Sequence, residues 1–320
     1  MKRRGVCLIL TDRCNAECEI CCFSCSPENK NVMDEDLMFE TIRQAAELGT
    51  VQQIGFSGGE PFLYYDLLKK GLMYAKELGF YTSVATNGFW GAWPDEMLEE
   101  KIKVLPIDQM SFSYDAYHGK YIKEEQFVRA MSICKILDIN VTVGIGETKG
   151  EGSANRFFKK MGDNKYLMNY YIYPFMPCGR AEGIPDEQFF KYRKGTELFC
   201  RDEETLAVRY DGEVFPCCTQ TVFSTCLSLG NIKNASVKEL IKNSRMAQTH
   251  EVMLNPRAFT ELGRIAREEL GMDLPDMCVS PCEICQKLFQ EDENFTRLYP
   301  YIDKLYKQML TKAFLGSKGV

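Results

Sequence analysis

A repeated alternation of short apolar segments and helical segments organises the first 175 residues. Each apolar segment ends in a loop, and each loop leads to a stretch whose apolar residues keep helical spacing. The expected strands cover 6–10, 51–57, 81–86, 109–114, 141–145 and 167–175. Strands that alternate with helices form a parallel sheet, because each helix returns the chain to the same edge. The sequence therefore predicts an α/β fold with a parallel sheet that is open or curved into a partial barrel.

The alternation ends near residue 190, and we place a domain boundary between 185 and 195. Beyond it, Asp211-Gly212 separates two short β-type segments and suits the tight turn of a hairpin. Short helices interleaved with cysteines make up the remainder. We expect two domains, a barrel over 1–190 and a small α+β domain over 191–320.

The composition restricts the class of protein. The chain has 15 cysteines in 320 residues, and the apolar run behind its basic start covers only 6–10, which suits a first strand better than a signal peptide. Clustered cysteines without a secretion signal indicate metal binding or catalysis in the reducing cytoplasm. No apolar run approaches the roughly 18 residues that span a membrane, and the net charge of −6 gives no electrostatic case for nucleic acid. His118 and His250 are the two histidines, so a histidine-rich metal site is not expected.

Three cysteines follow the first strand on one tight loop, with the spacing C-x3-C-x2-C. They are Cys14, Cys18 and Cys21. A structural zinc site takes four protein ligands, whereas three thiolates on a four-iron cluster leave one iron open to a small molecule. The spacing favours the iron–sulfur cluster. A zinc knuckle and buried thiols without a metal stay as alternatives, and Cys22 or Cys25 could replace a ligand.

This loop is similar to the signature C-x3-C-x-Φ-C of the radical S-adenosylmethionine (AdoMet) enzymes. Ile20 occupies the apolar position, which in that family packs near the adenine. The resemblance extends over about residues 5–185 and implies a partial (β/α)6 barrel of TIM type. It also implies that AdoMet chelates the open iron, and that an electron from the cluster releases a 5′-deoxyadenosyl radical that abstracts hydrogen.

Short polar or glycine-containing motifs at later strand ends resemble the AdoMet contacts of the family. Gly58-Gly59-Glu60-Pro61 is similar to its GGE motif, because the glycines let backbone approach a ligand and Glu60 can accept hydrogen bonds from an ammonium group. Arg180 can pair with a carboxylate. Asp115 is either a further AdoMet contact or a catalytic residue that faces the substrate. A plain turn is the alternative for each motif, and an exposed surface arginine is the alternative for Arg180. The other expected AdoMet contacts are Thr86, Asn87, Ser113, Gly144 and Ile145.

Seven cysteines lie in the second domain, and four of them are expected to hold a closed auxiliary [4Fe–4S] cluster. The expected ligands are Cys200, Cys217, Cys282 and Cys285. Zinc with the same ligands is the alternative. Residues 211–217 and 229–240 are similar to the SPASM and shortened "twitch" extensions of radical AdoMet enzymes. Too few well-placed cysteines remain for a third cluster, so two clusters are expected in all, although Cys226 and Cys278 leave the auxiliary ligand set open.

Cys218 follows a predicted ligand directly, and a thiol S–H bond is weaker than most C–H bonds. It can therefore deliver a hydrogen atom to a carbon radical, or it can be an alternative ligand or an inert thiol. Several segments look like the radical AdoMet peptide epimerases that act on ribosomally made peptides. In that family the second cysteine of the Pro-Cys-Cys element quenches the Cα radical from the opposite face, a role that carries over to Cys218. The segments are 14–27, 87–91, 113–118, 211–218 and 299–301.

The resemblance implies conversion of L- to D-residues in a ribosomally synthesised precursor peptide, with an electron donor such as flavodoxin or ferredoxin. A thioether or carbon–carbon cross-linking enzyme is the first alternative. A non-catalytic iron–sulfur or zinc scaffold that binds peptide is the second. We expect a cytoplasmic protein without nucleic-acid or membrane partners. No separate leader-binding domain is expected before the barrel, because the first strand begins by residue 6.

Overall fold

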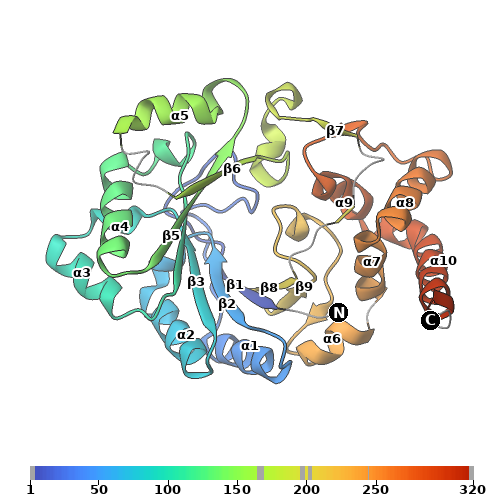
Figure 1. Cartoon of the computed structure of the whole chain (residues 1–320), viewed down its shortest axis with the longest axis horizontal. Helices are drawn as coiled ribbons and strands as arrows, with labels where there is room; N and C mark the ends of the chain where they lie inside the picture. Colours follow the sequence, from blue (N-terminus) through green and yellow to red (C-terminus); the bar gives the residue numbers. More distant parts are fainter. Residues whose placement is uncertain (1–3, 164–168, 195–198, 201–203, 244, 317–320) are drawn as a thin grey trace.

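A single curved sheet of nine strands forms the centre of the molecule (Figure 1). The computed structural model describes all residues except 1–3, 164–168, 195–198, 201–203, 244 and 317–320. The strand order is β10-β9-β8-β1-β2-β3-β4-β5-β6, and β1 to β6 are parallel to one another. The parallel strands are β1 (Gly5–Thr11), β2 (Gln53–Gly58), β3 (Tyr81–Thr86), β4 (Gln109–Ser113), β5 (Asn140–Glu147) and β6 (Tyr170–Pro174). The predicted α/β fold of partial-barrel type is confirmed.

Helices cover the outer face of this sheet, as Figure 1 shows. They are α1 (Glu35–Glu47), α2 (Tyr65–Glu77), α3 (Asp95–Lys103), α4 (Glu124–Ile136) and α5 (Ala154–Met161). Alternate residues of each strand, such as Ile54 and Phe56 of β2, pack against them in the main core. The opposite face carries small side chains in β1 to β3, among them Cys7, Gly55 and Ser83, which line an interior cavity.

The sheet also continues past β1, which the sequence did not predict. β8 (Thr205–Arg209) pairs in parallel with β1, and β9 (Glu213–Phe215) turns back beside it through the predicted hairpin at Asp211-Gly212. β10 (Gly230–Asn231) completes this edge. The hairpin of the expected second domain therefore belongs to the barrel sheet, and the boundary near residue 190 stays a prediction.

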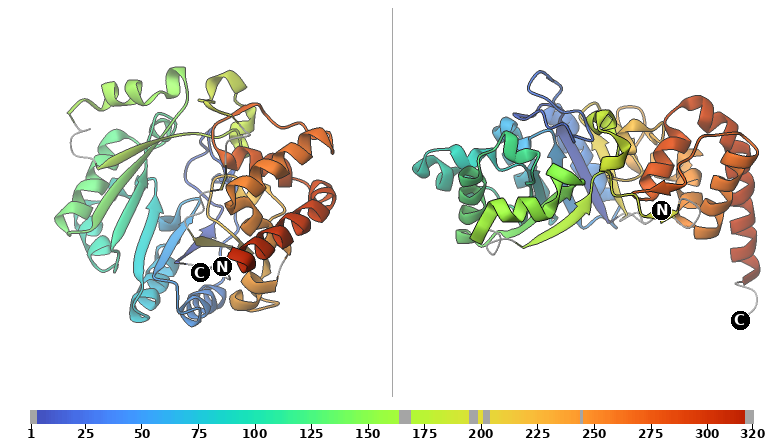
Figure 2. Two further views of the ribbon diagram at one scale, coloured as in Figure 1. Left: turned by 45° about the vertical axis from the view of Figure 1, so that its right-hand side comes forward. Right: turned by 90° about the horizontal axis from the view of Figure 1, so that it is seen from above.

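Helices of the C-terminal part form a second core on the far side of the opening (Figures 1 and 2). They are α7 (Arg245–Leu254), α8 (Pro256–Glu268), α9 (Pro281–Phe289) and α10 (Asp292–Gly316). The helix α6 (Val237–Asn243) instead packs in the main core through Val237 and Ile241. The sequence predicted helices near α6, α8 and α10 but missed α7 and α9. A short ladder joins β7 (Arg193–Lys194) to β11 (Met277–Cys278). Among the described residues, no helix combines the length and the apolar character needed to cross a bilayer.

Candidate active site and auxiliary centre

The three cysteines of the first motif lie on the loop that leaves β1, as predicted. Cys14 and Cys18 are buried, Cys21 is half-buried, and all three pack with Ile20 in one compact cluster. The loop is closed at its base by a hydrogen bond from Cys14 N to Ser26 O of 3.0 Å. This local closure presents the three thiols on the side of the sheet where the strands end.

The electrostatics of this loop suit a cationic inorganic centre. Burial, with the nearby Glu60 carboxylate, raises the pKa of Cys14 to about 12. Burial also raises the pKa of Cys18 far above its usual value, and Cys14 and Cys21 add to the effect. A hydrogen bond from the Cys25 thiol lowers the pKa of Cys21 to about 6. Cys14 and Cys18, whose pKa values are raised, become thiolates most readily when a metal centre supplies positive charge.

These residues fit a four-iron cluster by the chemistry of the donor set. In such a cluster each thiolate holds a different iron, so the three sulfurs need not surround one point. In the described part of the chain, no three His, Cys, Asp or Glu side chains surround a single ion position. The role of Cys14, Cys18 and Cys21 as cluster ligands stays a prediction.

The two glycines after β2 contact the cysteine loop through main-chain atoms. Gly59 N donates to Thr11 O at 2.7 Å, and Glu60 N donates to Arg13 O at 2.9 Å. A Cβ atom added to Gly59 would lie 2.1 Å from Arg13 O, and Gly58 has a φ of +137°. The close backbone approach that we assigned to a ligand is made here to the loop after β1. Gly58 and Gly59 therefore seat the cysteine loop on the end of β2.

Glu60 is fully buried and joins the ends of β2 and β3. Its carboxylate accepts hydrogen bonds from Phe62 N (3.1 Å), Thr86 Oγ1 (2.9 Å) and Asn87 N (2.8 Å). Burial raises the pKa of Glu60 to about 7, although these hydrogen bonds lower it in part. Asn87 in turn donates from Nδ2 to Cys14 Sγ at 3.7 Å. Glu60, Thr86 and Asn87 thus position the cysteine loop, and their contacts to AdoMet stay predictions.

Asp115 holds a tight turn after β4. One carboxylate oxygen accepts from Tyr117 N (2.9 Å) and His118 N (3.1 Å), and the other lies 3.0 Å from His118 Nδ1. Burial opposes a charge on His118, but the Asp115 carboxylate outweighs it and raises the pKa of His118. Asp115 has no exposed surface, and it lines a cavity of about 290 Å³ beside Tyr117 and Gly152 rather than the interior cavity. Its substrate-facing role stays a prediction, and the sequence argument missed its partner His118.

The remaining expected AdoMet contacts differ in where their side chains lie. Ile145 packs in the main core against the helices, so only its main chain can face the barrel interior. Gly144 lies on the inner face, and a Cβ atom there would be 3.0 Å from the Tyr171 hydroxyl. Ser113 is half-buried at the end of β4. The period of two along β5 could have predicted this difference between Gly144 and Ile145.

Arg180 binds the main chain of the cysteine loop. Its guanidinium donates from Nη1 to Cys18 O at 2.7 Å and from Nη2 to Cys25 O at 2.8 Å. The preceding Gly179 packs against the same loop, because a Cβ atom there would be 2.3 Å from Cys22 O. Arg180 thus fixes the cysteine loop through its main-chain carbonyls, and its pairing with a ligand carboxylate stays a prediction.

The four cysteines predicted for the auxiliary cluster meet at one apolar cavity. Cys200 precedes β8, Cys217 follows β9, and Cys282 and Cys285 lie on α9, yet all four line the same cavity. Burial raises the pKa of Cys285 well above its usual value, and the other three cysteines add to the effect. This donor set fits a closed auxiliary cluster, and the assignment of these four cysteines as its ligands stays a prediction.

The sequence left open whether Cys226 or Cys278 belongs to the auxiliary ligand set. Cys226 also influences Cys285 electrostatically, so it lies in the neighbourhood of the four. Cys278 packs in the second core with no exposed surface. His250 lines the cavity beside the cysteines, and the sequence argument missed it.

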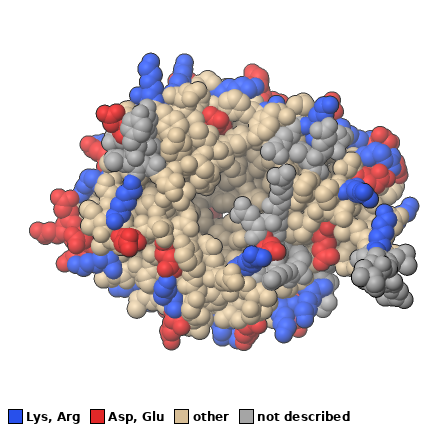
Figure 3. All heavy atoms as spheres, viewed as in Figure 1, with Lys and Arg blue, Asp and Glu red and all other residues tan. Residues whose placement is uncertain are grey.

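A larger cavity of about 790 Å³ occupies the interior of the barrel. Figure 3 shows the corresponding hollow at the centre of the molecule. Its walls include the inner face of β1 to β3, Tyr171 and Tyr173 of β6, and Cys218. Cys200 and Cys282 line both cavities, so the two are adjacent, whereas Cys217 lines the small one and Cys218 the large one. Consecutive cysteines thus face different sites.

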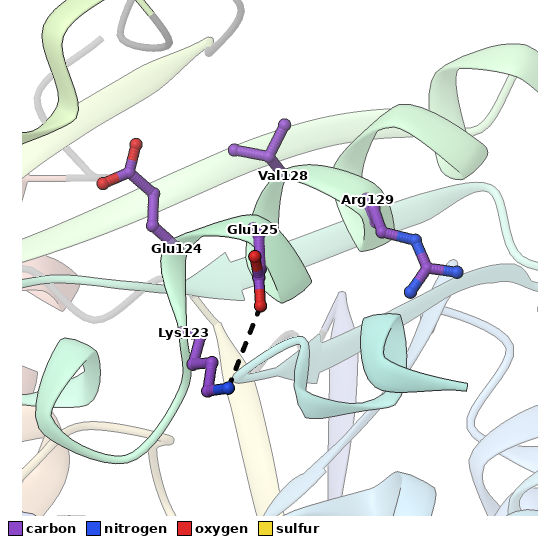
Figure 4. Close-up of a pocket in the computed structure, with 5 residues that line it drawn as sticks. All are labelled: Lys123, Glu124, Glu125, Val128 and Arg129. Atoms are coloured by element: carbon purple, nitrogen blue, oxygen red, sulfur yellow. Dashed lines mark ion pairs between the residues drawn. The ribbon is translucent and has the colours of Figure 1, made fainter. Parts of the chain in front are cut away.

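A depression of similar volume, about 770 Å³, lies on the outer surface at the start of α4. Its residues are mostly charged, and Lys123 Nζ lies 4.0 Å from Glu125 Oε1 (Figure 4). None of the predicted site residues lines it. The interior cavity is therefore the candidate substrate site.

Family models match both parts of the chain. The radical SAM superfamily matches residues 8–152, and the iron-sulfur cluster-binding domain SPASM matches residues 200–271. With the parallel sheet and the two cysteine sites, these matches define a radical SAM domain over residues 8–152 and a SPASM domain over residues 200–271. Both domains were predicted from the sequence. The cofactors of the chain are AdoMet and iron–sulfur clusters, one held by each domain.

Curated relatives differ in how much of the chain they cover. "Putative peptide biosynthesis protein YydG" of Bacillus subtilis is 28% identical over 96% of this chain and 99% of its own length. "Probable GTP 3',8-cyclase" of Methanosarcina mazei is 33% identical, but over only 36% of this chain and 34% of its own. The likeness to YydG therefore includes the second domain, and the likeness to the cyclase does not extend over the whole chain.

Solved structures share the fold at low identity. Streptococcus suis SuiB bound to the precursor peptide SuiA has a TM-score of 0.59 at 10% identity, over 88% of this chain and 76% of SuiB. In the complex of SuiB with S-adenosylmethionine, this chain covers 66% of SuiB. The enzyme anSMEcpe, with bound AdoMet and the Kp18Cys peptide, has a TM-score of 0.58 at 15% identity, over 95% of this chain and 99% of its own. These matches establish the fold.

Proposed function

We propose that this radical AdoMet enzyme converts L-residues to D-residues in a ribosomally synthesised peptide. The observation that carries the proposal is the orientation of Cys218 toward the interior cavity, while its neighbour Cys217 lines the cavity with the other auxiliary cysteines. A thiol in the wall of a substrate cavity, outside the predicted ligand set, is placed to donate hydrogen to a bound substrate.

Peptide as the substrate class is supported by the relatives. YydG is named a putative peptide biosynthesis protein, and SuiB and anSMEcpe have each been solved with a bound peptide. The cavity of about 790 Å³ has room for part of an extended chain. The position of Cys218 in the cavity wall favours epimerisation over cross-linking.

The proposed reaction uses two groups of residues, one to remove the Cα hydrogen and one to return a hydrogen. When bound, AdoMet and the cluster at Cys14, Cys18 and Cys21 supply the radical that removes the Cα hydrogen. Cys218 then gives its S–H hydrogen to the opposite face of the carbon radical, and its sulfur becomes a thiyl. One proton and one electron, from a donor such as flavodoxin or ferredoxin in the cytoplasm, restore the thiol. The peptide thus keeps its mass.

The experiment uses anaerobically reconstituted protein with AdoMet, a reductant and the precursor peptide encoded beside its gene, in D2O. We expect a gain of one mass unit per modified residue and D-residues after hydrolysis, because the returned hydrogen comes from an exchangeable thiol. A product lighter by two hydrogens would move the assignment to cross-linking. If no deoxyadenosine forms, the protein is a binding scaffold and the proposal fails.

A further inference from the structure

β6 is the last strand of the nine-stranded sheet, and its outer edge is unpaired among the described residues. Val143 N donates to Asn169 O at 2.8 Å, and Phe175 N donates to Glu147 O at 3.0 Å. These bonds fix the phase of the ladder, in which odd-numbered residues of β6 bond to β5. The main-chain groups of Tyr170 and Ile172 therefore point away from the sheet and can accept another strand.

Charged side chains, one usual protection against pairing, are absent from this edge. Edge strands are commonly guarded by charged side chains, yet the sequence of β6 is Tyr-Tyr-Ile-Tyr-Pro. Tyr171 is 55% exposed and Ile172 is 44% exposed. Pro174 ends the strand and has no N–H, so the outward N–H groups of this edge are those of Tyr170 and Ile172. An exposed, uncharged edge of this kind marks a binding site for an extended chain.

The inner side of β6 belongs to the cavity that Cys218 lines. Tyr171 and Tyr173 contribute to its wall, with ring centroids 5.7 Å apart. Tyr170 lies on the outer side, 4.7 Å from the ring of Phe158 on α5. A strand added to β6 would place every second side chain in the cavity and the others on the outer face.

The chemistry of the cavity restricts the added strand. None of its described lining residues is Asp, Glu, Lys or Arg, although charged residues make up 26% of the chain. A charged side chain placed there would lose hydration without gaining an ion pair. The inward residues of the occupant are therefore uncharged, which matches the uncharged edge beside them.

We propose that the substrate peptide binds as a tenth strand on the free edge of β6, with its reacting residue and other inward residues uncharged and facing the cavity of Cys218. The identity of the occupant rests on the proposed function. Main-chain hydrogen bonds to Ile172 give register, and the cavity selects the inward side chains.

Fluorescence anisotropy of a labelled precursor peptide with reconstituted protein and AdoMet, without reductant, tests this binding mode. Single N-methylations along the segment around the modified residue should weaken binding about fivefold to tenfold at every second position and hardly at all between them. Lysine substitutions at inward positions should weaken binding at least tenfold more than glutamine substitutions. Uniform tolerance, or equal loss at every position, would overturn the β6 site.

Ile172→Pro removes the outward N–H and should weaken peptide binding about fivefold to tenfold, whereas Ile172→Val keeps it and should bind normally. If Ile172→Pro does not fold, the N-methyl series decides alone. A dimer that forms through β6 and dissociates with Ile172→Pro, together with peptide binding indifferent to N-methylation, would show that a second copy occupies the edge.

Because the binding measurement needs no turnover, its outcome can be separated from the test of the epimerase function. Alternating N-methyl sensitivity with a cross-linked product upholds the β6 site and overturns the epimerase. An epimerised product from peptides that tolerate every N-methyl group overturns the β6 site alone. Absence of any peptide binding overturns both.

Discussion

The two cysteine sites are assembled in opposite ways. The barrel site takes its three thiols from one loop of twelve positions, 14–25, and neighbouring loops hold that loop through its main chain. The auxiliary site takes four thiols from three separate segments. Cys200 and Cys285 pack against the second core, whereas Cys217 and Cys282 pack against clusters on the barrel side. The barrel site therefore depends on backbone contacts between strand ends, and the auxiliary site depends on packing between the barrel and the C-terminal helices.

Removal of one ligand from each site should have the largest effect and should separate the sites. Cys21→Ala should abolish deoxyadenosine formation, because AdoMet loses its iron. Cys285→Ala should lower the iron content by about four per chain and stop peptide modification, but still allow deoxyadenosine to form. Iron analysis and chromatography of the products measure both effects.

The control for this pair is Cys134→Ala, a buried thiol of the main core. It should keep both clusters. Loss of deoxyadenosine formation in Cys285→Ala would contradict the independence of the two sites.

Gly59→Ala tests the backbone contact that seats the barrel site. The new Cβ would meet Arg13 O at 2.1 Å, so we expect the free energy of unfolding to fall by about 3 kcal/mol. Gly119→Ala is the control, because its nearest heavy atom lies at 3.6 Å. Denaturant unfolding of both variants measures the difference, and equal stabilities would refute the steric argument.

Glu60 should make the stability of the cluster-free protein depend on pH. Its folded pKa of about 7 lies above the ordinary 4.5, so its ionisation is disfavoured by folding. Relative to Glu60→Gln, the native protein should lose up to about 3 kcal/mol of stability as the pH rises from 4.5 to 7, and no more above that. Urea unfolding of both proteins across this range tests the sign. A difference that is constant with pH, or that favours the native protein as the pH rises, would be contrary to this account.

Arg180→Ala should have a smaller effect on stability, about 2 kcal/mol, because two charge-assisted hydrogen bonds to carbonyls are lost. Arg129 makes a comparable pair of bonds, to Gly91 O (2.6 Å) and Trp93 O (3.0 Å), away from the cysteines. Arg129→Ala should therefore lower stability similarly, and only Arg180→Ala should speed the loss of iron to a chelator. Equal rates of iron loss would remove Arg180 from the barrel site.

The sequence predicted what depends on local pattern. The alternation of strands and helices predicted the parallel sheet, and C-x3-C-x2-C predicted one compact thiol site. The convergence of the four auxiliary cysteines was expected from the family resemblance, and the structure brings them to one cavity.

The roles of Arg180 and Glu60 could not be predicted in this way. Both bind groups of the protein that are distant in sequence, and such contacts exist only once the strand ends are side by side. Pairing of β8 with β1 has the same origin, because a strand after the barrel carries no local sign of its partner. His118 was the exception, since its spacing from Asp115 within one turn was a usable signal.

The central claim is that Cys217 and Cys218, although adjacent, serve different sites. The measurement is peptide turnover in D2O, with iron content, for Cys217→Ala and Cys218→Ala in parallel. We predict that Cys218→Ala keeps its full iron content and forms deoxyadenosine but yields no deuterated D-residue, whereas Cys217→Ala loses auxiliary iron. Loss of iron in Cys218→Ala, or deuterated D-residues formed without that thiol, would contradict the account.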